Sequence, residues 1–131
     1  MLKLEKINYN DLNSKAKEIY NFQKVSAVLA DYGFTCMWLN NDWQGADFIA
    51  VHLDGNTDIK VQLKGRLSFD KKYIGKDIYI CFIEDGYTYL YPHDTILSQI
   101  ENVKNYVDDK GNWSNKKLTK KHAELLEQYK L

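Results

Sequence analysis

The chain has few of the residues and segments that mark disulfide-bonded, metal-binding or membrane proteins. Its two cysteines, Cys36 and Cys81, are too few for a disulfide framework and lack the spacing of metal ligands. Both stand in apolar segments, so we expect them in the core. No apolar run approaches the roughly 18 residues that cross a bilayer, and residues 1–6 lack the apolar core of a secretory signal. We therefore expect a reducing, cytoplasmic location and no membrane partner.

Several catalytic motifs and all linker-like segments are missing as well. There is no glycine-rich phosphate loop and no Gly-x-Ser-x-Gly motif. The histidines are scattered: His52 and His122 fall on apolar faces, and His93 follows the single proline at an expected helix start. With 44% hydrophobic residues and no low-complexity tract, the sequence predicts one folded domain over residues 1–131.

Charge is balanced overall but unevenly distributed. The net charge is +0, yet residues 60–76 contain six basic residues against one acid. The basic residues of this first cluster are Lys60, Lys64, Arg66, Lys71, Lys72 and Lys76, and a second cluster comprises Lys116, Lys117, Lys120 and Lys121. Phosphate binding depends on local potential more than on total charge, and Arg66, the only arginine, offers a rigid fork for phosphate. Solvated surface loops are the alternative reading of both clusters.

Hydrophobic periodicity predicts helices flanking a sheet. Spacings of three and four through Phe22, Val25, Leu29 and Tyr32 indicate a helix over residues 11–32 that ends at Gly33. Strands are expected over residues 34–39, 46–53, 57–63, 78–83 and 87–91. Helices are expected from residue 94, with an inward face of Ile96, Ile100, Val103 and Val107, and from about residue 119. The predicted class is α/β (α+β), a single mixed sheet flanked by helices in the order α-β-β-β-β-β-α-α.

The second and third predicted strands place three polar side chains together. If Gly55 and Asn56 form a two-residue turn, Asp47 lies directly opposite Lys64. Side chains alternate along a strand, so Asp47, Gln62 and Lys64 share one face. The other face carries an apolar set fit for the core: Phe48, Ala50, Ile59, Val61 and Leu63.

This polar set suits metal-assisted hydrolysis of a phosphodiester. That reaction needs an activated water and a cation to absorb developing charge, and Mg²⁺ binds through one or two carboxylates while keeping waters. Asp47, the Gln62 amide oxygen and the Leu63 main-chain carbonyl are the predicted ligands of Mg²⁺ or Mn²⁺. Lys64 would orient or deprotonate the attacking water. The alternative is a sheet face whose Asp47 and Lys64 form an ion pair and do no chemistry.

The constellation resembles the PD-(D/E)xK nuclease superfamily over about residues 15–91. In that pattern an aspartate on one strand is followed on the next by an acid, any residue and a lysine; Asp47 matches the aspartate and Lys64 the lysine. Glu18 lies where many members place a further acid on the first helix. Two positions depart from the pattern: Ala46 replaces proline, and Gln62 replaces the second acid, which removes one negative charge from the metal site.

The resemblance implies a restriction endonuclease-like fold and a metal-dependent DNA endonuclease. Asp47, Gln62 and Lys64 would be its catalytic centre, with Glu18 assisting. The expected DNA contacts are Arg66, Lys71, Lys72, Lys76, the second basic cluster and Trp43, which would stack on a base or simply pack. One such site cuts one strand, so double-strand cleavage predicts a homodimer or larger assembly. The alternative function is an inactive, nuclease-derived module that binds DNA or a protein partner.

Overall fold

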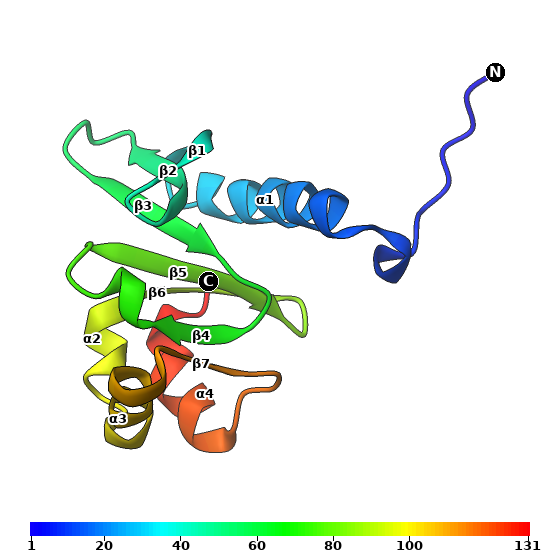
Figure 1. The fold of residues 1–131 in the computed structure, drawn as a ribbon. Coiled ribbons are helices and arrows are strands. Elements are labelled where there is room, and N and C mark those ends of the chain that lie inside the picture. Colours follow the sequence, from blue (N-terminus) through cyan, green and yellow to red (C-terminus); the bar gives the residue numbers. More distant parts are fainter.

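The computed structural model describes the backbone of residues 1–131 and every side chain except that of Asp42. A short 3-10 turn, η1 (Tyr9–Asp11), leads into the long helix α1 (Ser14–Ala30). The Asn13 side chain caps α1 by accepting the backbone N–H of Ala16 at 2.8 Å, which satisfies a donor that the helix itself leaves unpaired. The residues before η1 extend away from the rest of the chain (Figure 1).

The predicted first helix is confirmed, with ends two to three residues inside the predicted range. Val25 and Leu29 are buried as expected. Tyr32 is not: its side chain is 50% exposed, because the helix has already ended at Ala30. Gly33 then adopts a φ of +86°, a backbone conformation that favours glycine, and turns the chain into the first strand.

A mixed sheet of five strands forms the centre of the fold, as predicted. Its order is β1-β2-β3-β5-β6, and all neighbours are antiparallel except β3 and β5, which are parallel. The strands are β1 (Phe34–Trp43), β2 (Ala46–His52), β3 (Asp58–Leu63), β5 (Ile78–Glu84) and β6 (Tyr87–Pro92). Parallel neighbours require a crossover between β3 and β5.

That crossover contains structure that the sequence pattern did not predict. Strand β4 (Leu67–Asp70) pairs antiparallel with β7 (Asn112–Asn115) in a separate two-stranded sheet, so the expectation of a single sheet was incomplete. The 3-10 turn η2 (Lys71–Tyr73) follows β4 and leads toward β5. Leu67, Phe69 and Tyr73 are buried, which fixes the crossover against the main core.

The C-terminal half supplies the remaining helices, α2 (His93–Leu97), α3 (Glu101–Lys110), α4 (Lys120–Leu126) and the turn η3 (Glu127–Tyr129). The predicted helix from residue 94 is therefore two helices, which separate at Ile100 (φ −123°, ψ 82°). Its predicted inward face is confirmed, because Ile96, Ile100, Val103 and Val107 are all buried. In Figure 1, α2, α3 and α4 gather on the side of β5 and β6 away from β1.

Two hydrophobic clusters lie on opposite faces of the main sheet. The first joins Ile80 and Phe82 of β5 to the C-terminal helices and the crossover. The second joins Val25 and Leu29 of α1 to Phe48, Val61 and Cys81, with Cys36 packed against it. Both cysteines are free thiols in or against this core, as predicted, and burial raises the pKa of Cys81 to about 12. No helix in the described chain is long and apolar enough to cross a membrane.

The hairpin between β2 and β3 has the predicted faces but a different register. Phe48 pairs with Val61 and Val51 with Asp58, so the register differs by two residues from the predicted one and Asp47 does not lie opposite Lys64. The cause is a wider turn. The Asp54 carboxylate accepts the backbone N–H groups of Asn56 and Thr57, each at 2.8 Å, and the Thr57 hydroxyl at 2.7 Å. Because the shift is even, each side chain keeps its predicted face.

Candidate functional site

The site begins where β2 starts and β3 ends. Asp47 Oδ2 accepts the backbone N–H of Leu63 at 2.9 Å, which ties the carboxylate to the end of the neighbouring strand. The β2–β3 register, continued by one residue, places Gln62 beside Asp47. The N–H and C=O of one strand residue point to the same side, so the Leu63 carbonyl is directed toward β2 and the Asp47 carboxylate. These three oxygen-bearing groups thus lie together.

Lys64 directly follows β3 and lies on the same face as Gln62. Its backbone N–H donates to the carbonyl of Cys81 at 2.8 Å, and its Nζ lies 5.4 Å from the centre of the Tyr73 ring. Burial lowers the pKa of the Lys64 ammonium, and the nearby charge of Lys72 lowers it further. Asp47 and Asp70 act in the opposite direction. The ammonium is therefore less strongly protonated than an exposed lysine.

A hollow of about 450 Å³ opens in front of Asp47 and Gln62, and Leu63 and Lys64 are not part of its described lining. It is lined by Gln44, Gly45, Asp47, Gln62, Lys72, Tyr73 and Lys76. A Cβ at Gly45 would lie 3.0 Å from Cδ1 of Tyr73, and the residue has a φ of +85°. Glycine therefore allows the β1–β2 turn to pack directly against the crossover, which closes one side of the hollow.

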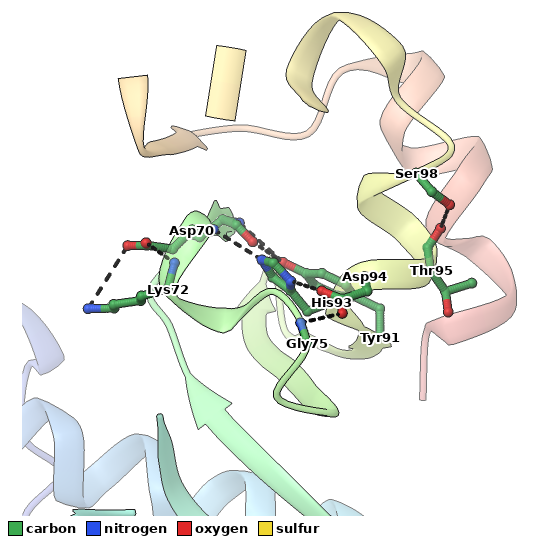
Figure 2. A network of polar contacts seen from close by, with 9 residues as sticks. Asp70, Lys72, Gly75, Tyr91, His93, Asp94, Thr95 and Ser98 are labelled. Carbon is green, nitrogen blue, oxygen red and sulfur yellow. Dashed lines mark hydrogen bonds and ion pairs between the residues drawn. The ribbon is translucent and has the colours of Figure 1, made fainter. Parts of the chain in front are cut away.

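A polar network centred on the buried His93 fixes the crossover segment that carries Lys72 and Tyr73 (Figure 2). The backbone N–H of Asp70 donates to His93 Nε2 at 3.1 Å, so this nitrogen is the acceptor and Nδ1 carries the ring proton. Nδ1 donates to Asp94 Oδ1 at 2.8 Å, and Asp94 Oδ2 accepts the backbone N–H of Gly75 at 2.9 Å. His93 thus links both ends of η2 to the start of α2.

Tyr91 fixes the same segment two residues earlier, at Ser68. Its hydroxyl donates to the carbonyl of Ser68 at 2.7 Å and accepts the Ser68 N–H at 3.2 Å. The ring is fully buried, and burial raises the pKa of its phenol above the ordinary value. Together, Tyr91 and His93 hold Ser68 and Asp70 of β4 and thereby the position of η2.

Glu18 lies apart from the other predicted catalytic residues. It is on α1, which packs on the sheet face opposite Asp47, and its carboxylate pairs with Lys15 at 3.2 Å. Its side chain is 42% exposed and is not among the described residues that line the hollow. The structure thus brings Asp47, Gln62, Leu63 and Lys64 together without it.

The predicted DNA contacts do not all lie at the hollow. Lys72 and Lys76 line the hollow, and Lys71 and Arg66 are exposed at opposite ends of β4. Pairing of Leu67 with Asn115 brings Arg66 to the start of the second basic cluster, which the sequence places 50 residues away. Lys116, Lys117, Lys120 and Lys121 are all exposed, but Lys121 faces α3 rather than the hollow. Trp43 is 51% exposed, with Lys60 Nζ 5.8 Å from its ring centre.

The donor set is chemically suited to a hard cation, although it is sparse. Within the described part of the chain, no group of three or more His, Cys, Asp or Glu residues could hold a metal ion. Asp47, Gln62 and Leu63 offer one carboxylate, one amide oxygen and one carbonyl. All are oxygen donors, and Mg²⁺ accepts one or two carboxylates with water in its other positions. The residues present therefore fit Mg²⁺ or Mn²⁺, with less negative charge than two acids would supply.

One residue of the hollow, Tyr73, was not singled out from the sequence, whereas Gln44 was predicted with Trp43 to contact a base. Both residues line the hollow, and the Tyr73 ring lies next to Lys64 Nζ. Tyr73 is the only aromatic residue in the stretch of residues 70–78, and that position was the available signal. Its contact with Gly45 depends on the fold of the crossover, which local periodicity does not reveal.

The chain was compared with known proteins. No family model matches it, and no curated protein sequence matches it. Among solved structures, it is similar to Hjc, a Holliday junction resolvase from the archaeal hyperthermophile Archaeoglobus fulgidus. The two share 12% sequence identity, with a TM-score of 0.48 over 60% of this chain and 74% of the resolvase chain.

Proposed function

We propose that residues 1–131 form one nuclease-like domain that hydrolyses phosphodiester bonds in DNA with a bound Mg²⁺ or Mn²⁺. The observation that carries the proposal is the position of Asp47 and Gln62 in a hollow also lined by Lys72 and Lys76. The Leu63 N–H donates to Asp47, and the Asp47 charge acts on the nearby Lys64. Oxygen ligands for a cation, a half-buried lysine and cations for a phosphate backbone are the groups that such hydrolysis requires.

Asp47, Gln62 and Leu63 would hold the cation through their oxygens. When bound, the cation would polarise a phosphoryl oxygen and lower the pKa of a coordinated water. The hydrogen bond from the Leu63 N–H fixes one oxygen of Asp47 and so orients the carboxylate. Gln62 binds without adding charge.

Lys64 would act on the attacking water. Its lowered pKa increases the fraction of neutral amine near physiological pH, and a neutral Nζ accepts a proton. In its charged form the same group stabilises negative charge on the phosphate. The ring of Tyr73 restricts the position of Nζ.

Lys72 and Lys76 would hold the phosphates next to the cleaved bond. Arg66, Lys71 and the Lys116–Lys121 cluster would extend this contact along the backbone, and Trp43 would stack on a base. One hollow cleaves one strand, so cleavage of both strands would require a homodimer or larger assembly. Glu18 would assist only if substrate binding brought it to the hollow.

The test is cleavage of plasmid, single-stranded and branched DNA in Mg²⁺ and in EDTA. Lys64→Ala should lower the cleavage rate by at least about 100-fold, while DNA affinity changes little. Lys104→Ala is the matched control, because Lys104 is an exposed lysine paired with Asp108 on α3. Cleavage by Lys64→Ala at the parent rate would contradict the proposal.

A second candidate function is a DNA- or protein-binding module that has lost catalysis. The observation that favours it is the single carboxylate in the donor set. Gln62→Glu tests whether position 62 is a metal ligand, because an added carboxylate should then tighten Mn²⁺ binding in calorimetry. DNA binding without cleavage by the wild-type chain or Gln62→Glu would favour the binding module.

A further inference from the structure

A second cavity, of about 500 Å³, lies on the α1 side of the sheet next to the end of β3. Residues of α1 and of the segment before it, among them Tyr9, Tyr20, Asn21 and Lys24, line one part of it, and the end of β3 lines another. Its volume lies in the range of about 300–1,000 Å³ typical of sites for small ligands. Nothing in the roles given above to Asp47, Gln62 and Lys64 requires this cavity.

Two tyrosine rings line the cavity, and each lies beside a lysine ammonium. The rings of Tyr9 and Tyr20 lie 5.3 Å apart at an angle of 57°. Lys17 Nζ lies 5.3 Å from the Tyr9 ring centre, and Lys24 Nζ lies 5.3 Å from that of Tyr20. A ring beside a flexible ammonium provides a stacking surface for a base and a cation for its phosphate.

The wall also carries a pair of hydrogen-bonding groups. Asn21 Nδ2 donates to the Tyr9 hydroxyl at 2.9 Å. The hydroxyl still has its own proton to donate, and the Asn21 amide oxygen is an acceptor. A donor and an acceptor side by side match the edge of a nucleobase. The apolar part of the lining comprises Val28 of α1, Leu63 of β3 and Ile83 of β5.

The cavity adjoins the candidate site at the end of β3, although it opens on the face of the sheet opposite Asp47. Leu63 and Lys64 belong to both, because the Leu63 N–H meets Asp47 while both residues line the cavity. A nucleotide next to the cleaved phosphate would therefore lie within reach of the cavity. A paired base cannot enter it, since a base inside a duplex is stacked and its pairing edge is occupied.

We propose that this cavity binds one unpaired nucleobase of the DNA substrate, stacked on Tyr20, so that the protein prefers DNA with an unpaired nucleotide over a perfect duplex. The inference rests on the proposed function and names a substrate feature for it. Tyr9 and Asn21 would contact the edge of the base, and Lys24 would move from the Tyr20 ring to the adjoining phosphate.

The experiment uses the full chain in EDTA, so that binding is measured without cleavage. One duplex carries a single bulged 2-aminopurine, whose fluorescence is quenched on stacking, and a matched duplex lacks the bulge. The wild type should bind the bulged duplex more tightly and quench it. Tyr20→Ala should weaken that binding by about 5- to 150-fold and abolish the quenching, with unchanged binding of the matched duplex. Tyr20→Phe should retain both properties, because the ring remains.

Tyr106→Ala is the matched control, since Tyr106 is a helical tyrosine on α3 and is 49% exposed. Circular dichroism checks that each variant is folded. Equal binding of the two duplexes by the wild type, or unchanged quenching in Tyr20→Ala, would overturn the base site. If the matched duplex is still cleaved in Mg²⁺, the proposed function stands without the base site. A wild type that neither binds nor cleaves DNA would overturn both.

Discussion

The crossover between β3 and β5 contacts polar residues in two contrasting settings. His93 and Tyr91 are buried, and each ring hydrogen-bonds the backbone of β4. Around Lys64 the groups are half-buried, and the charge of Lys72 acts against that of Lys64. The first arrangement is what stability requires of buried polar groups. The second places like charges together at a cost in stability, which is expected where a protein binds an anion.

The largest effect on stability should follow loss of the buried imidazole. His93→Ala removes the acceptor of the Asp70 N–H and the donor to Asp94, and it leaves a cavity beside Phe69 and Tyr73. We expect a loss of about 2–5 kcal/mol in the free energy of unfolding, measured with urea. A much smaller loss in the free energy of unfolding would show that the hydrogen bonds of His93 do little to stabilise the crossover.

His122→Ala provides the control for that experiment. His122 is half-buried, and its Nδ1 has no hydrogen-bond partner in the described part of the chain. His122→Ala should therefore lower the free energy of unfolding by less than His93→Ala does. Equal losses for the two variants would show that packing of the ring, rather than its hydrogen bonds, holds the crossover.

The next largest effect tests the other anchor. Tyr91→Phe keeps the buried ring but leaves the N–H and the carbonyl of Ser68 without their hydroxyl partner. The expected loss is about 1–3 kcal/mol in the free energy of unfolding. Tyr106→Phe, at an exposed tyrosine, should change nothing measurable. If Tyr91→Phe left the free energy of unfolding unchanged, the difference drawn between the buried polar groups and those around Lys64 would be contradicted.

The sequence predicted the strands and their faces better than the contacts that set the register of β2 and β3 and hold the crossover in place. Alternating residues identified the faces of β2 and β3, because period-two patterning follows directly from strand geometry. The register was wrong by two, since the hydrogen bonds of one side chain, Asp54, decide the width of the turn. The apolar alternation of Leu67 and Phe69 was a signal for β4 that was not used. Its partner β7 is polar apart from Trp113, and only a long-range pairing reveals it.

The roles of His93 and Tyr73 had no comparable local signal. His93 was read as a residue at a helix start, which is correct, yet its acceptor contact is with Asp70, 23 residues earlier. Tyr73 reaches Gly45 only because the crossover folds back over the β1–β2 turn. Residue types and strand faces can thus be predicted here from local pattern, whereas contacts made through the crossover depend on the complete fold.

A third prediction concerns the charged groups around Lys64. Lys72→Met should raise the pKa of Lys64, because it removes a like charge that lowers it. Asp47→Asn should lower the same pKa further, since it removes an opposite charge. Lys71→Met is the control: the Lys71 ammonium lies near the Asp108 carbonyl and is not among the charges that shift Lys64. NMR titration of the Lys64 side-chain carbon next to Nζ provides the measurement. An unchanged pKa in Lys72→Met would place the two lysines too far apart to act on one phosphate.

The smallest effect concerns Asp54, where a carboxylate makes several hydrogen bonds without burial. Backbone and side-chain donors of Asn56 and Thr57 lower the pKa of Asp54 to about 2 from an ordinary value of 3.8. A carboxyl whose pKa is depressed by folding contributes stability above its unfolded pKa, and that contribution is lost as the pH falls through the folded value. The wild type should therefore be slightly more stable than Asp54→Ala at pH 7, and the difference should shrink between about pH 4 and pH 2. If the difference between the wild type and Asp54→Ala were constant across that range, the ionised carboxylate would not be what holds the wide turn, and the register of β2 and β3 would need another cause.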